Sequence, residues 1–147
     1  MQEEQPTLLV VEDDPGHASL IERNLRRAHL PYDIVLLRNG QAVLDYLAPA
    51  RDAGEARPPP PCLVLLDLNL PGRSGVEVLA RLKSDPRTKH IPVIVLTTTD
   101  DPHEIERCYA LGCNAYLTKP IAYDQFVAVI QQLSWWLTTI ATPTGVS

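Results

Sequence analysis

The chain has 147 residues, 45% hydrophobic and 21% charged, a size that fits one domain with a substantial core. Its 18 acidic and 13 basic residues give a net charge of −5, which argues against nucleic-acid binding through phosphates. Acidic residues precede the first apolar run, and no run approaches the ~18 residues of a membrane span, so we expect a soluble cytoplasmic protein. The three cysteines, Cys62, Cys108 and Cys113, have neither a C-x-x-C nor a zinc spacing, which favours buried thiols in a reducing compartment.

Short apolar runs alternate along the chain with segments of helical periodicity. The runs cover residues 8–11, 34–37, 63–66, 93–96 and 115–117. Capping residues mark four helix starts and one helix end: Asp14-Pro15, Asn39-Gly40, Ser74-x-x-Glu77, Asp101-Pro102-x-Glu104 and the terminal Gly112. This alternation predicts an α/β fold around a parallel sheet.

The helix between the first two runs is predicted to be amphipathic. One face carries His17, Ile21, Asn24, Leu25 and Ala28, and the opposite face is rich in arginine and glutamate. We expect the first face to pack on the sheet. The four histidines of the chain show no metal-ligand spacing, so we expect them at the surface or at helix edges.

Residues 48–61 interrupt this rhythm. The segment has no periodicity and ends in four consecutive prolines, which neither a helix nor a central strand accommodates. We interpret it as a surface insertion before the third strand. A domain linker and a proline-rich ligand segment are the alternatives.

Polar residues follow the predicted strands. Glu12, Asp13 and Asp14 follow the first, Asp67 and Asn69 the third, a threonine triplet begins at Thr97 after the fourth, and Lys119 follows the fifth. The carboxyl ends of parallel strands meet at one sheet edge, where α/β proteins place their sites. Asp14 is the exception, because we expect it to cap the first helix.

Converging carboxylates repel one another, and a hard divalent cation would relieve the repulsion. Mg²⁺ prefers oxygen ligands and keeps several waters, which suits Asp13 and Asp67 with a backbone carbonyl. Lys119 adds a positive charge and Thr97 a hydroxyl donor. Together these groups are the parts of a phosphoryl-transfer site.

Four motifs in this order resemble the receiver domain of two-component response regulators: LLVVEDD, LVLLDLNLPGRSG, PVIVLTTT and AYLTKP. The resemblance implies a flavodoxin-like, CheY-like doubly wound (βα)5 fold, with a five-stranded parallel sheet in the order 2-1-3-4-5. We expect this domain over residues 7–140, followed by a short tail over 141–147.

The same resemblance implies a role for each motif residue. Asp67 is the expected phosphoacceptor, and Mg²⁺ is expected to be held by Glu12, Asp13, Asp67 and the carbonyl of Asn69. The chain would then catalyse its own phosphorylation and dephosphorylation without being an enzyme for another substrate.

Further residues are expected to contact the phosphate or to respond to it. Lys119 would contact the phosphate, Thr97 would be the switch hydroxyl and Tyr116 the switch aromatic. Phosphorylation would shift the population towards a state with an altered face of the fourth helix, fifth strand and fifth helix.

The insertion, the phrase LDLNLPGRSGVEVLARLKSDP and the tail QQLSWWLTTI are similar to those of single-domain regulators that partner phytochrome-type histidine kinases. The expected partners are such a kinase and a downstream phosphotransfer or effector protein. The helical stripe Phe126, Ile130, Leu133, Leu137 and Ile140 would face the sheet. Trp135 and Trp136 would then pair two copies as a homodimer; a frayed helix with Trp135 folded back is the alternative.

Three other functions are less well matched. A haloacid-dehalogenase-like phosphatase needs an Asp-x-Asp nucleophile motif, whereas here Asn69 stands two residues after Asp67. A flavin-binding module needs a phosphate-binding loop after the first strand, which is missing from this sequence. A receiver that signals by protein contact without phosphate would not require the acidic pair and Lys119.

Overall fold

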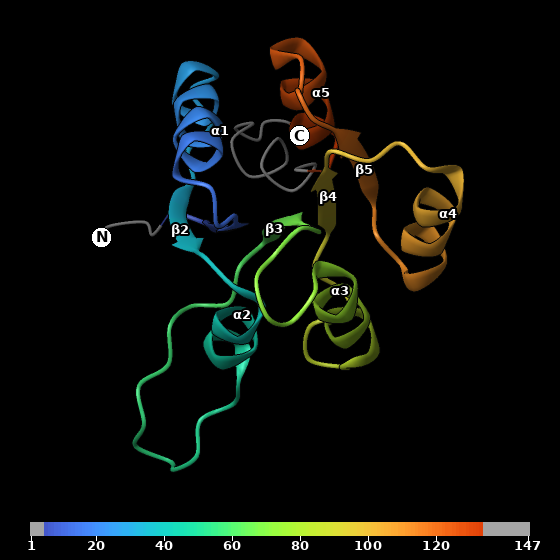
Figure 1. Ribbon diagram of the computed structural model, residues 1–147. Coiled ribbons are helices and arrows are strands. Elements are labelled where there is room, and N and C mark those ends of the chain that lie inside the picture. Colours follow the sequence, from blue (N-terminus) through green and yellow to red (C-terminus); the bar gives the residue numbers. More distant parts are fainter. Residues whose placement is uncertain (1–4, 134–147) are drawn as a thin grey trace, which may run out of the picture.

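The computed structural model describes residues 5–133. Five parallel strands form one sheet in the order β2-β1-β3-β4-β5, which confirms the predicted topology. The strands are β1 (Thr7–Val11), β2 (Asp33–Leu37), β3 (Leu63–Asp67), β4 (Val93–Thr97) and β5 (Ala115–Thr118). The helices that alternate with them are α1 (Pro15–Arg27), α2 (Gly40–Leu47), α3 (Gly75–Ser84), α4 (Pro102–Leu111) and α5 (Tyr123–Leu133) (Figure 1).

The predicted capping residues begin and end these helices. Asp14 accepts hydrogen bonds from the first backbone amides of α1, and Asn39, Ser74 and Asp101 do the same for α2, α3 and α4. Gly112 ends α4 with a φ of 111°, in the left-handed region that favours glycine. The helix boundaries therefore follow from local side-chain chemistry.

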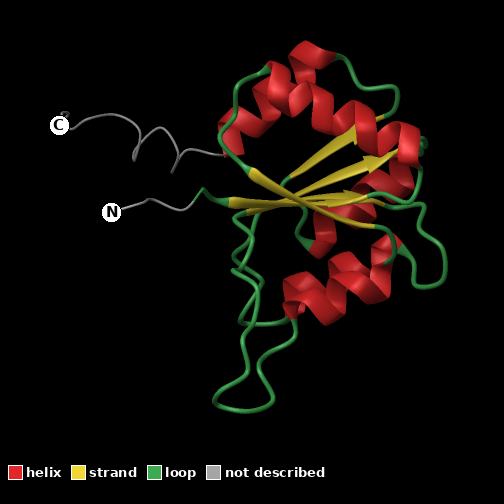
Figure 2. Ribbon diagram, turned by 90° about the vertical axis from the view of Figure 1, so that its left-hand side faces the viewer, coloured by secondary structure: helices red, strands yellow, loops and turns green. Residues whose placement is uncertain are grey.

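Helices cover both faces of the sheet (Figure 2). On one face, Leu8 and Val10 of β1 pack in a cluster that includes Ile21 of α1 and Phe126 of α5. On the other face, the alternate β1 residues pack with side chains from α2 and α3. Because both faces are covered, every residue of β1, β3 and β4 is buried.

The predicted apolar face of α1 is correct in its centre and wrong at its start. Ile21 and Leu25 are buried as expected, and Ala18 is buried beside them. His17 is exposed, with 47% of its side chain accessible, which contradicts its place on that face but agrees with the surface position expected of the histidines. It stands at the first turn of α1, beyond the edge of the sheet.

Residues 48–61 contain neither helix nor strand and extend away from the sheet between α2 and β3 (Figure 2). Three hydrogen bonds hold this loop to the end of α2. The Arg57 guanidinium donates to the carbonyl oxygens of Asp45 (2.6 Å) and Tyr46 (3.1 Å), and the Tyr46 hydroxyl donates to the Pro59 carbonyl (3.2 Å).

The C-terminal predictions are only partly covered by the structure. Phe126 and Ile130 are buried against the sheet, as the predicted stripe requires. Trp135, Trp136, the expected domain end at residue 140 and the tail over 141–147 lie outside the described residues. Within residues 5–133, no helix is long and apolar enough to span a membrane, and the three cysteines are free.

Gly75 allows α3 to begin directly against the end of β3. A Cβ at this position would lie 2.5 Å from both the Asp67 carbonyl oxygen and the Leu68 Cα, and both of these neighbours are backbone atoms. We predict that Gly75→Ala lowers the free energy of unfolding by about 2 kcal/mol, as overpacking does. Gly54→Ala is the matched control, because nothing lies within 4 Å of the position that its Cβ would occupy. Urea denaturation measures both, and equal midpoints for the two variants would contradict this account.

Candidate functional site

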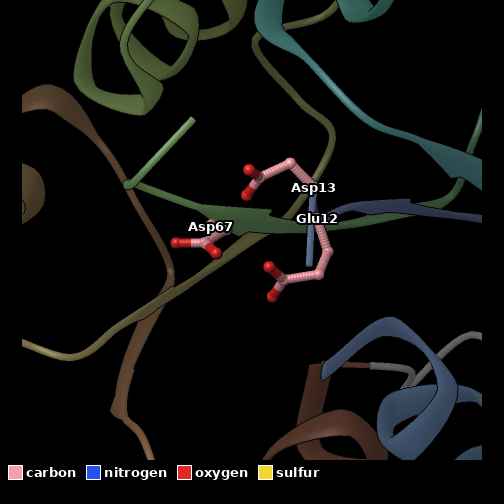
Figure 3. Close-up of side chains that lie close together, drawn as sticks. All are labelled: Glu12, Asp13 and Asp67. Carbon is pink, nitrogen blue, oxygen red and sulfur yellow. The ribbon is translucent and has the colours of Figure 1, made fainter. Parts of the chain in front are cut away.

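Three carboxylates meet at the carboxyl edge of the sheet. Glu12 and Asp13 follow β1, and Asp67 is the last residue of β3. One carboxylate oxygen from each lies within 4.8 Å of the others, and Figure 3 shows the three side chains around one space. Glu12 and Asp67 are only 1% and 3% exposed, whereas Asp13 is exposed.

The strand pairing places these residues together. β1 and β3 are neighbours in the sheet, and Val11 is paired with Leu66. The next residue on each strand is the carboxylate-bearing one, so Glu12 and Asp67 stand side by side. The proximity is therefore a consequence of sheet order and register.

Lys119 supplies the opposite charge. Its Nζ donates to Glu12 Oε1 at 2.6 Å and to Asp67 Oδ2 at 3.0 Å. Only 10% of the lysine side chain is exposed, so water screens these ion pairs weakly. The lysine joins the loop after β5 to the ends of β1 and β3.

The pKa values of two groups reflect this balance. Burial raises the pKa of Glu12, the adjacent Asp67 raises it further, and Lys119 opposes both. Burial alone would lower the pKa of Lys119, but Glu12 and Asp67 together outweigh it and raise that pKa. Lys119 is therefore a firmly positive charge among the carboxylates.

Both oxygens of Asp67 accept hydrogen bonds. The backbone N–H of Asn69 donates to Oδ1 at 2.8 Å, while Lys119 occupies Oδ2. The Asn69 side-chain amide donates to Thr98 Oγ1 at 3.3 Å. The Asn69 backbone N–H and the Lys119 ammonium together fix the orientation of the Asp67 carboxylate.

A cavity of about 400 Å³ opens beside Asp67. The residues that line it come from the ends of β1, β3, β4 and β5 and from the start of α1: Glu12, Asp13, Asp14, Pro15, His17, Asp67, Asn69, Thr98 and Lys119. Its volume is sufficient for a metal ion with waters and a phosphoryl group. Glu12, Asp13 and Asp67 offer carboxylate oxygens to a cation, and these suit a hard divalent ion.

Two predicted residues lie apart from this cavity. Thr97 is fully buried at the end of β4, and its Oγ1 accepts a hydrogen bond from the Thr99 N–H at 3.3 Å. The Tyr116 hydroxyl donates to the Thr99 carbonyl at 3.0 Å and contacts Glu104 at 3.3 Å. Burial raises the pKa of Tyr116, so its hydroxyl keeps its proton.

Sequence reasoning did not place Thr98 and His17 at the cavity. Thr98 belongs to a threonine triplet, and strand propensity alone is enough to explain this member of it. His17 has no ligand spacing, but its Nδ1 lies 3.1 Å from Lys119 Nζ. His17 lies in the first turn of α1, shortly after the acidic pair, and this position in the sequence could have indicated that its side chain lies near the site.

The raised pKa of Glu12 predicts a pH-dependent cost to stability. A folded-state pKa above the ordinary value of 4.5 means that the folded protein binds this proton more tightly than the unfolded chain. Stability from this group is therefore present at low pH and is lost as the pH rises above that ordinary value. We predict that Glu12→Gln becomes progressively more stable than the wild type from about pH 4 to pH 7 in chelator-containing buffer.

Chemical denaturation at several pH values measures this difference. Glu22→Gln, which removes a half-exposed carboxylate that pairs with Arg26 on α1, is the control and should hardly change the pH dependence. If the wild type instead gained stability over Glu12→Gln as the pH rises, attraction to Lys119 would outweigh burial and the repulsion from Asp67.

The fold agrees with comparisons to known proteins. A family model described as the response regulator receiver domain matches residues 8–131. Response regulator Rcp1 of Synechocystis sp. is 37% identical over 138 residues, which cover 92% of each chain.

Solved structures show the same similarity. The phosphorylated cyanobacterial phytochrome response regulator RcpA is 36% identical, with a TM-score of 0.74 over 92% of this chain and 96% of that one. The Mn²⁺-bound form of Rcp1 is also 36% identical, with a TM-score of 0.73 over 94% of this chain and 99% of that one. With this fold, this acidic edge and a family match over most of its length, the chain belongs to the response regulator receiver domains.

Proposed function

We propose that Asp67 accepts a phosphoryl group from the phosphohistidine of a sensor histidine kinase in a Mg²⁺-dependent reaction. The observation that carries the proposal is the position of the Asp67 carboxylate between the acidic pair and Lys119, beside an open cavity. Receiver domains act with histidine kinases, and the structural relative RcpA is described as phosphorylated.

Glu12, Asp13, Asp67 and the Asn69 carbonyl are the proposed Mg²⁺ site. The carboxylates offer the oxygen atoms that this ion prefers, and the relative Rcp1 has a Mn²⁺-bound form. When bound, Mg²⁺ would neutralise negative charge on the phosphoryl oxygens and on the carboxylates.

In the proposed transfer, an Asp67 carboxylate oxygen attacks phosphorus. A P–O bond forms, the P–N bond of phosphohistidine breaks, and the histidine nitrogen keeps the electron pair. The product is an aspartyl (acyl) phosphate, in which the negative charge lies on the phosphoryl oxygens and no longer on the Asp67 carboxyl group. Lys119, which contacts Asp67 Oδ2 before the reaction, stands close enough to pair with a phosphoryl oxygen afterwards.

Signal output is proposed to pass through Thr97 and Tyr116. A hydrogen-bonded chain connects them, from the Thr97 hydroxyl through the Thr99 backbone to the Tyr116 hydroxyl. If Thr97 turns to the phosphate, this chain must rearrange, and the face formed by α4, β5 and α5 changes with it. Protein contact or phosphorelay is the proposed output.

The chain is also proposed to catalyse its own dephosphorylation. Asn69 lines the cavity beside Asp67 and carries an amide that can orient a water molecule. Thr99, two residues after the proposed switch hydroxyl Thr97, is the second position proposed to tune water attack, and its side chain is too short to reach over the phosphate. We expect Asn69 and Thr99 to tune the phosphate lifetime.

The proposed phosphate donor is a phytochrome-type histidine kinase. The similarity to Rcp1 and RcpA extends over most of each chain, and RcpA is described as a phytochrome response regulator. The proposed downstream partner is a phosphotransfer or effector protein. Homodimer formation through Trp135 and Trp136 stays a prediction from the sequence, since both residues lie outside the described part of the chain.

The acceptor assignment predicts a single phosphorylation that requires metal. Treatment with phosphoramidate and Mg²⁺ should add one phosphate to the intact mass of the wild type and none to Asp67→Asn. Asp52→Asn, in the exposed loop over residues 48–61, should react as the wild type does. Asp13→Asn should slow the reaction more than about tenfold at a fixed Mg²⁺ concentration, because it removes a metal ligand.

A full adduct on Asp67→Asn would exclude the acceptor. An unmodified wild type under the same conditions would instead favour a receiver that signals without phosphate.

The donor assignment predicts a kinetic preference. A phytochrome-type kinase labelled on its histidine should transfer phosphate to this chain at least about tenfold faster than an unrelated histidine kinase, because specificity is a difference in transition-state binding. Rapid-quench gels measure the two rates. Equal rates would remove the support for a phytochrome-type donor and leave the Asp67 assignment intact.

A further inference from the structure

The Lys119 ammonium has a third partner besides the two carboxylates. His17 Nδ1 lies 3.1 Å from Lys119 Nζ. A lysine ammonium has three N–H donors and no acceptor, so Nδ1 must be the acceptor in this contact. The ring proton of the neutral imidazole is then on Nε2. All three ammonium hydrogens thus have a protein acceptor: Glu12, Asp67 and His17.

The start of α1 holds His17 in this place. The Asp14 carboxylate accepts from the backbone N–H of His17 at 3.0 Å, and the Asp14 N–H donates to Glu12 Oε2 at 3.2 Å. The Glu12 carboxylate, which accepts a hydrogen bond from Lys119, thereby also anchors the turn that carries His17. The imidazole reaches the lysine from outside the sheet, and 47% of its side chain is exposed.

A neutral acceptor is suited to this position. A third carboxylate would cancel more of the lysine charge and add repulsion to the acidic cluster. A water molecule would leave the ammonium free to move. The imidazole can direct the ammonium without reducing the positive charge that it presents to a phosphoryl group.

We infer that His17 is a positioning residue, which holds the Lys119 ammonium towards the phosphoryl group on Asp67. This inference rests on the proposed function. Phosphorylation removes the negative charge of the Asp67 carboxylate and places a charged phosphoryl group there, so Lys119 Nζ must exchange Asp67 Oδ2 for a phosphoryl oxygen. Glu12 and His17 are the acceptors that keep Nζ in place. His17 acts through Lys119 and is assigned no contact with the metal.

Substitution of His17 tests the inference directly. His17→Ala removes the acceptor and should slow phosphorylation by phosphoramidate roughly tenfold, the effect of one hydrogen bond to a charged group. His17→Asn should restore most of the rate, because Oδ1 of asparagine stands as far along the side chain as Nδ1 of histidine. The control is His103→Ala, which changes an exposed histidine in the first turn of α4, also after an Asp-Pro step.

A double mutant separates positioning from a general structural role. In a Lys119→Met background, His17→Ala should cause no further loss of rate, since its effect passes through the missing lysine. A loss that persists in that background would overturn the inference. So would a His17→Ala rate equal to that of the wild type, or an Asn variant as slow as the Ala variant.

A readout without phosphate keeps the inference distinct from the proposed function. The side-chain ammonium signal of Lys119 in proton–nitrogen NMR should be visible in the wild type and in His17→Asn, and should broaden or vanish in His17→Ala. If the wild type accepts no phosphate, the proposed function fails while this spectrum still decides whether His17 holds Lys119. An unchanged Lys119 signal in His17→Ala would contradict the inference.

Discussion

Repulsion among three carboxylates is the constraint on which this structure depends. Two unit charges 4 Å apart repel by about 1 kcal/mol in water and by several times more at a partly buried site. Glu12 and Asp67 are buried side by side, and Asp13 lies within reach of both. Lys119 is placed between the two buried acids and makes the cluster tolerable.

Several features of the fold serve this arrangement. The adjacency of β1 and β3 brings the acids together, and β5, at the far side of β4, leads into the lysine. Gly75 lets α3 begin against the backbone of Asp67 and Leu68, so the acceptor sits on a closely packed turn. The rigid core thus carries a site whose charges are only partly compensated, which is the arrangement that favours a divalent cation and a phosphoryl group.

Much of this architecture could be predicted from the sequence because the signals are local. Apolar runs and capping residues predicted the strands and helix ends, and each polar group was placed by the strand that it follows. Asp67, Asp13 and Lys119 could be paired in advance because parallel strands share one carboxyl edge. The same reasoning placed Gly112 at the end of α4.

The remaining details depend on tertiary contacts that no local pattern encodes. Helical periodicity assigned His17 to a buried face, but the helix begins beyond the sheet edge, so its side chain reaches Lys119 instead. The Asn69 backbone N–H donates to Asp67 Oδ1, whereas the sequence predicted only a metal-binding carbonyl for Asn69. Thr98 lines the cavity, whereas Thr97 is buried. Successive side chains of an extended chain point to opposite sides, so the two neighbouring threonines face different surroundings.

Chemical trapping of the phosphorylated residue tests the central claim most directly. Borohydride reduces an aspartyl phosphate to homoserine, and peptide mass spectrometry then identifies the position. After reaction with a phosphorylated histidine kinase and Mg²⁺, the account predicts homoserine at position 67 alone. Homoserine at position 13, or phosphate on a hydroxyl or histidine side chain with Asp67 unmodified, would contradict it.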